Sequence, residues 1–143
     1  MVELSSDRLH ATTVAIDGLA VMIEGASGSG KSDLALRLID RGAVLVSDDQ
    51  TLVVRAGTIL RARAPATIAG RIEVRGIGIL AMPHVEDVPV GMLVRVDGMI
   101  ERMPERRVRR IAGIEVRQFA VDPFHASAPI KVELALRNPE LPE

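Results

Sequence analysis

Eight consecutive residues, 25–32, carry the clearest chemical signal in the sequence. They spell a complete Walker A pattern, Gly-x-x-x-x-Gly-Lys-Ser. Glycines let backbone N–H groups curl around a phosphate, and the start of a helix adds partial positive charge. The lysine can reach the terminal phosphates and the serine hydroxyl can bind the accompanying Mg²⁺. We therefore predict a nucleotide-phosphate loop made of Gly25, Ala26, Ser27, Gly28, Ser29, Gly30, Lys31 and Ser32.

A pair of acidic residues, Asp48 and Asp49, directly follows the apolar run Val44-Leu45-Val46. A carboxylate at the end of a strand beside a phosphate loop is typical of a Mg²⁺ ligand or a general base. Neighbouring side chains on a strand point in opposite directions, so we expect one to face the metal and the other an incoming hydroxyl. A solvated turn is the alternative, and the sequence leaves open which acid does which.

Three further polar residues are candidates. Glu73 and Arg75 lie two positions apart in an alternating segment, so we expect both on one face. On a solvated face they would only support each other, whereas the following Gly76-x-Gly78 favours a strand that bends or lies close under a ligand. His10 precedes the first predicted strand, where a surface histidine is the alternative. We expect the basic cluster at 106–110 to form a solvated face or a patch for an acidic partner.

The elements that must hold these residues follow from periodicity. Strands at 11–16 and 19–23 form a predicted hairpin around Asp17-Gly18, and the Gly-rich loop then opens a helix over 31–41. Further strands are predicted at 43–46, 51–55, 58–61, 71–80, 92–96 and 115–121, with a terminal helix at 130–137. We find no repeat and no linker, so residues 1–143 are predicted to be a single P-loop catalytic domain of the α/β class.

Composition limits the partners. The chain has 143 residues, 48% of them hydrophobic, a net charge of -1 and no cysteine. This charge argues against nucleic acid or an anionic membrane as partner, and the lack of cysteine excludes disulfides and thiolate metal sites. No run approaches the ~20 apolar residues of a membrane span. With two Phe and no Tyr or Trp, base stacking on aromatic side chains is scarce. We expect a cytoplasmic protein.

Taken in order, His10, the loop at 25–32, Leu45–Asp49 and Glu73–Ile79 resemble the catalytic domain of the bacterial HPr kinase/phosphorylase family, over about residues 8–137. The chain is similar to a short form that lacks the usual N-terminal domain. The resemblance implies a P-loop kinase fold similar to the nucleotide domain of phosphoenolpyruvate carboxykinase. It also implies an enzyme using ATP and Mg²⁺ to phosphorylate a serine of HPr, the phosphocarrier of the sugar phosphotransferase system, and a homo-oligomer, typically a hexamer.

The resemblance also implies roles for individual residues. Asp49 would be the base that takes the serine proton, with Asp48 assisting at the metal. Ser32 and Glu73 would hold Mg²⁺, and Lys31 would bind the phosphates. The residues expected around the transferring group are His10, Arg75 and, in the segment Glu101-Arg102-Met103-Pro104, Arg102.

Two departures from the family pattern matter. Asp33 stands where the family usually has Glu, and the late Pro-Gly-Arg-Asn loop linked to dephosphorylation is replaced by the stretch Asp122–Pro129. We therefore expect weak reverse phosphorylase activity. Two other functions remain alternatives: a regulatory ATP-sensing module without phosphotransfer, and a P-loop kinase of small molecules. The residues fit either ATP or pyrophosphate as donor.

Overall fold

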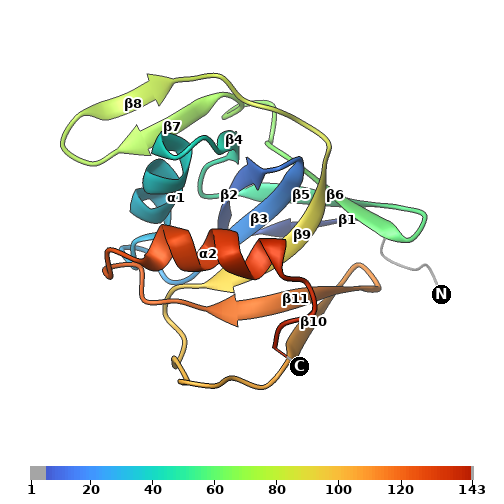
Figure 1. The fold of residues 1–143 in the computed structure, drawn as a ribbon. Helices are drawn as coiled ribbons and strands as arrows, with labels where there is room; N and C mark the ends of the chain where they lie inside the picture. Colours follow the sequence, from blue (N-terminus) through green and yellow to red (C-terminus); the bar gives the residue numbers. More distant parts are fainter. Residues whose placement is uncertain (1–5, 143) are drawn as a thin grey trace.

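A curled, mixed sheet with two helices on one face organises the chain (Figure 1). The computed structural model describes residues 6–142. Its elements are β1 (Ser6–Leu9), β2 (Ala11–Ile16), β3 (Leu19–Glu24), α1 (Lys31–Asp40), β4 (Val44–Ser47), β5 (Thr51–Ala56), β6 (Ile59–Arg63), β7 (Arg71–Val74), β8 (Gly78–Ala81), β9 (Val88–Arg95), β10 (Arg107–Ile111), β11 (Ile114–Ala120) and α2 (Ala128–Arg137).

The strand order explains which loops meet. Over the described residues the large sheet runs β1-β5-β6-β9-β3-β2-β4, and β11 pairs with β9 and with β10. The pairs β3–β9 and β9–β11 are parallel. The carboxyl ends of these three strands therefore lie at one edge of the sheet, where ligands bind in open α/β folds. The segments that follow them, 25–30, 96–106 and 121–127, gather at that edge.

Apolar side chains form a core on each face of the central strands. Successive residues of a strand point to opposite faces. Thus Ile23 packs with α1 and α2, whereas Met22 packs in the second core on the other face. Leu93 and Val94 of β9 divide in the same way. Burial on both faces is the reason that β3 is a continuous apolar run rather than an alternating one.

The predicted α/β class is confirmed, and the elements from residue 11 to 63 lie within about two residues of their predicted bounds. The single strand predicted at 71–80 is wrong. It is the hairpin β7–β8, with a turn at 75–77. Gly76 and Gly78 have φ of 87° and 130°, so they serve a turn between two strands where we expected a bend in one strand or a close approach to a ligand.

Other elements differ from expectation. The strands β1 and β10 were not predicted, because their charged residues hide any apolar periodicity. The strand β9 begins at Val88, four residues before the predicted start, and includes Pro89. The helix α2 begins at Ala128 with a proline in its first turn, a position that proline tolerates. Within the part of the chain described, neither helix has the length and apolarity that crossing a membrane requires.

Candidate active site

The Gly-rich loop lies between β3 and α1, as its sequence predicts. Gly28 and Gly30 have φ of 78° and 101°, in the left-handed region that favours glycine. Lys31 is buried, and its Nζ donates to the carbonyl oxygens of Gly25 (2.9 Å) and Ala26 (3.1 Å). The lysine ammonium is therefore folded back onto the carbonyl groups of the loop.

Asp48 forms hydrogen bonds with residues of the helix α1 and of the strands β2 and β7. Its Oδ1 accepts hydrogen bonds from Ser32 Oγ (2.9 Å) and Thr12 Oγ1 (3.1 Å). Its Oδ2 accepts one from the backbone N–H of Glu73 (2.9 Å). Hydroxyl and carboxylate oxygens are the donors that Mg²⁺ takes in proteins. This donor set beside the phosphate loop therefore fits the ion that the sequence pattern implies.

Asp49 faces a different way from Asp48. Its φ of 67° is in the left-handed region, and its N–H donates to Thr12 Oγ1 (3.1 Å). Its Oδ1 lies 2.6 Å from Nε2 of His10, and its side chain is 62% exposed. An ionised carboxylate can only accept, so with Asp49 in that form Nε2 of His10 is the donor of this bond. Among residues 6–142, nothing donates a hydrogen bond to Oδ2 of Asp49, which leaves that oxygen available to an incoming group.

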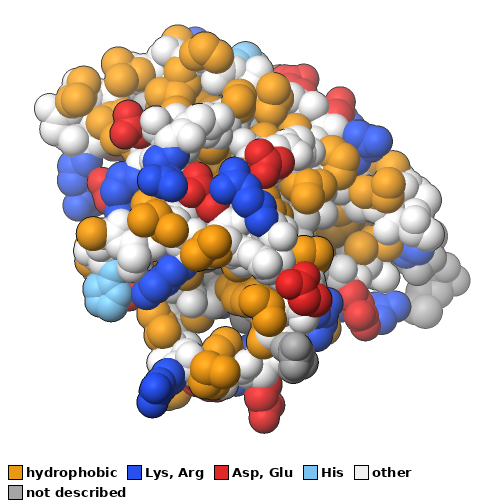
Figure 2. Space-filling model, in the orientation of Figure 1, with side chains coloured by type: hydrophobic (Ala, Val, Ile, Leu, Met, Phe, Trp, Pro, Cys, Tyr) orange, Lys and Arg blue, Asp and Glu red, His pale blue; other side chains and the backbone are white. Residues whose placement is uncertain are grey.

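A cleft of about 420 Å³ opens beside the acid pair. Its walls combine carboxylates, two arginines and apolar groups: Arg8, Asp48, Asp49, Gln50, Pro65, Thr67, Ile68, Arg71, Glu73 and Ile79. The β7–β8 hairpin forms its outer wall, and the apolar side chains gathered at the upper left of Figure 2 lie over this hairpin in Figure 1. Ile77 and Ile79, at its tip and on β8, are 72% and 71% exposed. This wall can therefore contact another protein.

Two predicted residues lie apart from this cluster. Arg75 is exposed in the turn of the β7–β8 hairpin, and Arg102 is exposed between β9 and β10. Within the described residues neither forms a hydrogen bond or ion pair with His10, Asp48 or Asp49. The expectation that Glu73 and Arg75 share a strand face is wrong, because the strand ends at Val74. The structure thus brings together His10, Lys31, Ser32, Asp48, Asp49 and Glu73.

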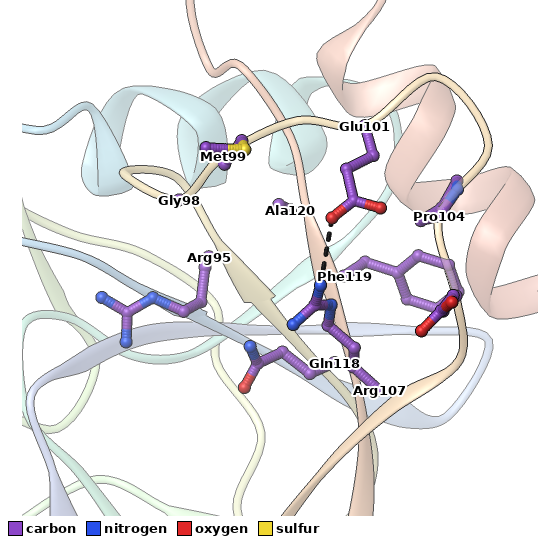
Figure 3. Close-up of a pocket in the computed structure, with 10 residues that line it drawn as sticks. Arg95, Gly98, Met99, Glu101, Pro104, Arg107, Gln118, Phe119 and Ala120 are labelled. Carbon is purple, nitrogen blue, oxygen red and sulfur yellow. Dashed lines mark hydrogen bonds and ion pairs between the residues drawn. The ribbon is translucent and has the colours of Figure 1, made fainter.

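A second cavity, of about 220 Å³, lies between the segment that carries Arg102 and the strand β11. In Figure 3 the Glu101 carboxylate points across it toward Arg107, whose Nη2 donates to Glu101 Oε1 at 3.0 Å. Phe119 and Gln118 of β11 form its floor, and Arg102 is not among the residues that line it. This cavity holds none of the predicted site residues.

Asp97 is a site residue that the sequence analysis missed. Its Oδ2 accepts the backbone N–H of Ala26 in the phosphate loop (2.9 Å), and its Oδ1 accepts from Arg95 (2.8 Å). The Ala26 N–H, and after it the Arg95 guanidinium, hold the pKa of Asp97 below its ordinary value. A Cβ on Gly25 would lie 2.8 Å from Val96 and 3.4 Å from Asp97, so only glycine fits this first turn. Like the acid pair, Asp97 follows a strand, and that signal could have found it.

Glu24, the last residue of β3, extends this support. Its Oε1 accepts from Arg95 and from Arg109, both at 2.6 Å. The expectation that residues 106–110 form a solvated face is therefore wrong for Arg109, which reaches inward from β10 to the strand that leads into the phosphate loop. Ion pairs of Glu24 with Arg95 of β9 and Arg109 of β10 therefore hold the start of the loop.

No group of three or more His, Cys, Asp or Glu side chains lies close enough to bind a metal between residues 6 and 142. The oxygen atoms that contact one another at Ser32 are thus its hydroxyl and the Asp48 carboxylate rather than a group of several acidic side chains.

Comparison with known proteins agrees with this geometry. A sequence model of the family "HPr Serine kinase C-terminal domain" matches residues 3–86. The HPr kinase/phosphorylases of Burkholderia lata and Cupriavidus pinatubonensis are each 31% identical over 144 residues, which cover 91% of this chain and 45% of theirs. That of Clostridium acetobutylicum is 43% identical over 76 residues, 53% of this chain and 25% of its own.

The solved structure of the Hpr(Ser) kinase/phosphatase from Coxiella burnetii superposes with a TM-score of 0.82 at 28% identity, covering 94% of this chain and 97% of that one. The matched residues of this chain span between a quarter and a half of the length of the curated relatives above. The family match nevertheless includes the phosphate loop, the acid pair and Glu73. This chain therefore belongs to the HPr serine kinase C-terminal domain family.

Proposed function

We propose that this chain transfers the γ-phosphoryl group of ATP to a serine hydroxyl of HPr. One observation carries the proposal: the bond of Ser32 to Asp48 joins the phosphate loop to an acid pair whose second member, Asp49, keeps one oxygen available. Relatives named HPr kinase/phosphorylase support HPr as the acceptor. An ATP sensor would need the loop but would have no use for an available carboxylate beside it.

Each residue then has a chemical task. The loop N–H groups and Lys31 bind the phosphates, and Ser32, Asp48 and Glu73 would hold Mg²⁺, which neutralises phosphate charge when bound. Asp49 accepts the serine proton while the serine oxygen bonds to the γ-phosphorus and the bond to the β–γ bridging oxygen breaks, releasing ADP. His10 orients Asp49 through the 2.6 Å bond. A positioned base of this kind contributes about 10²–10⁴-fold.

The remaining roles belong to the same proposal. Arg75 and Arg102 lie on exposed segments, so their action on the transferring group requires those segments, or a second copy of the chain, to deliver them. We propose a homo-oligomer, a hexamer as the family resemblance implies, and a single catalytic domain over residues 1–143. The exposed isoleucines of the β7–β8 hairpin suit such contacts. HPr as substrate would place the chain in the cytoplasm.

Transfer of label from γ-labelled ATP to HPr tests the proposal. We expect labelled HPr in the presence of Mg²⁺, and none with an HPr whose acceptor serine is replaced by alanine. Binding of ATP without labelled HPr would contradict the kinase function and favour a sensor. Static light scattering of the full chain, compared with the mass of one copy, tests the oligomer separately.

A further inference from the structure

An aromatic ring stands in solvent beside the phosphate loop. Phe124, between β11 and α2, is 76% exposed, although large apolar side chains gain free energy by burial. The chain has only two Phe and no Tyr or Trp. The other one, Phe119, is half-buried against the first core, with the Arg117 guanidinium 5.1 Å from its ring centroid.

The ring is next to the residue that opens α1. A Cβ on Gly30 would lie 3.7 Å from Cε1 of Phe124 and 3.1 Å from Cγ of Pro123. Figure 1 shows the same arrangement, with the segment between β11 and α2 beside the start of α1. Phe124 therefore borders the Gly-Lys-Ser end of the phosphate loop.

The backbone around Phe124 is held in place. Arg37 of α1 donates to the carbonyl oxygens of His125 (3.2 Å) and Pro123, and the N–H of Phe124 donates to Asp122 Oδ1 (3.0 Å). These bonds fix the segment to the same helix that carries Lys31 and Ser32. The aromatic ring is thus presented at a set position rather than on a loose loop.

Strand order decides which part of a ligand reaches this ring. The acid pair follows β4, on the β2 side of β3, whereas residues 121–127 follow β11, on the β9 side. A nucleotide on the loop with its terminal phosphate toward the acids must extend its nucleoside away from them. Phe124 is the aromatic group exposed on that side of the loop, within the described residues.

We infer that Phe124 is the stacking platform for the base of the bound nucleotide, an inference that rests on the proposed use of ATP. An aromatic face binds purines without reading their edges, because every base has a π-face. Removal of such a platform weakens binding about 5- to 150-fold per stacked base. ATP and GTP should therefore bind with similar affinity.

Titration calorimetry of the full chain with Mg²⁺, using ATP and inorganic tripolyphosphate as probes, separates the contribution of the base to binding affinity from that of the phosphates. We expect Phe124→Ala to weaken ATP at least about fivefold and to leave tripolyphosphate unchanged, while Phe124→Trp retains ATP affinity. Leu134→Ala, a matched truncation of an exposed apolar residue on α2, should change neither. Melting temperatures check that each variant is folded.

Phe124→Trp also gives a direct optical readout, because it would be the sole tryptophan of the chain. Purine stacking should quench its fluorescence on addition of ATP or ADP, and tripolyphosphate should leave it unchanged. An equal response to both ligands, or unchanged ATP affinity in Phe124→Ala, would overturn the inference. So would a Phe124→Ala effect confined to the KM of the protein substrate. If the wild-type chain binds neither ATP nor tripolyphosphate, the proposed function fails and this inference fails with it.

Discussion

The two flanks of the phosphate loop are built in different ways. On the β4 flank, short side chains bond to one another, as in Ser32 to Asp48 and His10 to Asp49. On the β11 flank, which includes the segment after β9, side chains bond to the backbone of the loops, as in Arg37 to the carbonyl of His125 and Asp97 to the N–H of Ala26. Under the proposed function, the first flank arranges charge for phosphoryl transfer, and the second holds loops in position. Substitutions on the two flanks should therefore change the activity of the chain in different ways.

Lys31→Ala should have the largest effect, because it removes the positive charge that the phosphate loop, between the two flanks, would offer to the phosphates. We expect transfer to fall by at least about 10²–10³-fold and tripolyphosphate binding to be lost. The side chain also bonds two loop carbonyls, so circular dichroism and melting temperature must show that the variant is folded. A folded variant with wild-type transfer would remove the phosphate-loop assignment.

Asp49→Asn tests whether Asp49, on the β4 flank, is the base. The amide keeps the size of the side chain but cannot take the serine proton, so transfer should fall by at least about 10² while ATP affinity changes little. Calorimetry and single-turnover transfer separate the two quantities. Lost ATP binding with normal transfer per bound complex would instead assign Asp49 to the metal and make Asp48 the residue to test as base.

The direction of the reaction tests the β11 flank. Reversal needs inorganic phosphate beside phosphoserine, and their repulsion at about 4 Å is about 4 kcal/mol per pair of unit charges at an effective dielectric constant of about 20. The segment 122–129 supplies no arginine, and His125 lies 3.3 Å from the Asp122 carboxylate, which offsets any charge it gains. We expect release of HPr from its phosphoserine form, at saturating phosphate, to be slower than the forward rate. An equal or faster reverse rate would refute this.

Asp97→Asn should have the smallest effect, a loss of about 2- to 10-fold in ATP affinity, since the amide still accepts from Ala26 but loses its charge. The pKa of Asp97 is lowered by folding, so its contribution is present above the ordinary value of 3.8 and disappears as pH falls through the lower, folded value. The Ala26 amide, followed by NMR, should titrate in that acidic range in wild type and lose this titration in Asp97→Asn. Titration of the Ala26 amide above 3.8 in wild type would show that the contact is absent in solution.

Sequence predicts the β4 flank well because local rules govern it. A Gly-rich loop between an apolar strand and a helix has few other uses, and acids at a strand end point to the same edge of the sheet. The family pattern added His10 and Glu73, whose contacts with Asp49 and Asp48 span 39 and 25 residues. No periodicity could have paired residues so distant.

The contacts of the β11 flank were not predicted, because they depend on long arginine side chains. Arg109 reads as one member of a solvated basic run, yet it reaches Glu24 across 85 residues. The position of Arg109 in the fold, rather than the charge of its neighbours in sequence, decides its contact. The wrong prediction at Gly76 and Gly78 has another cause. Glycines occur both in a bend within one strand and in a turn between two strands, so the residue type alone does not distinguish the two.

The most direct test of the proposed function is identification of the product. Full chain incubated with Mg²⁺, ATP and HPr should give HPr that gains one phosphoryl group by intact mass, with tandem spectrometry locating it on serine. The Asp49→Asn chain, at the same concentration, should give at most about a hundredth of that rate. Unmodified HPr from a wild-type chain that binds ATP, or phosphate on histidine rather than serine, would contradict the account.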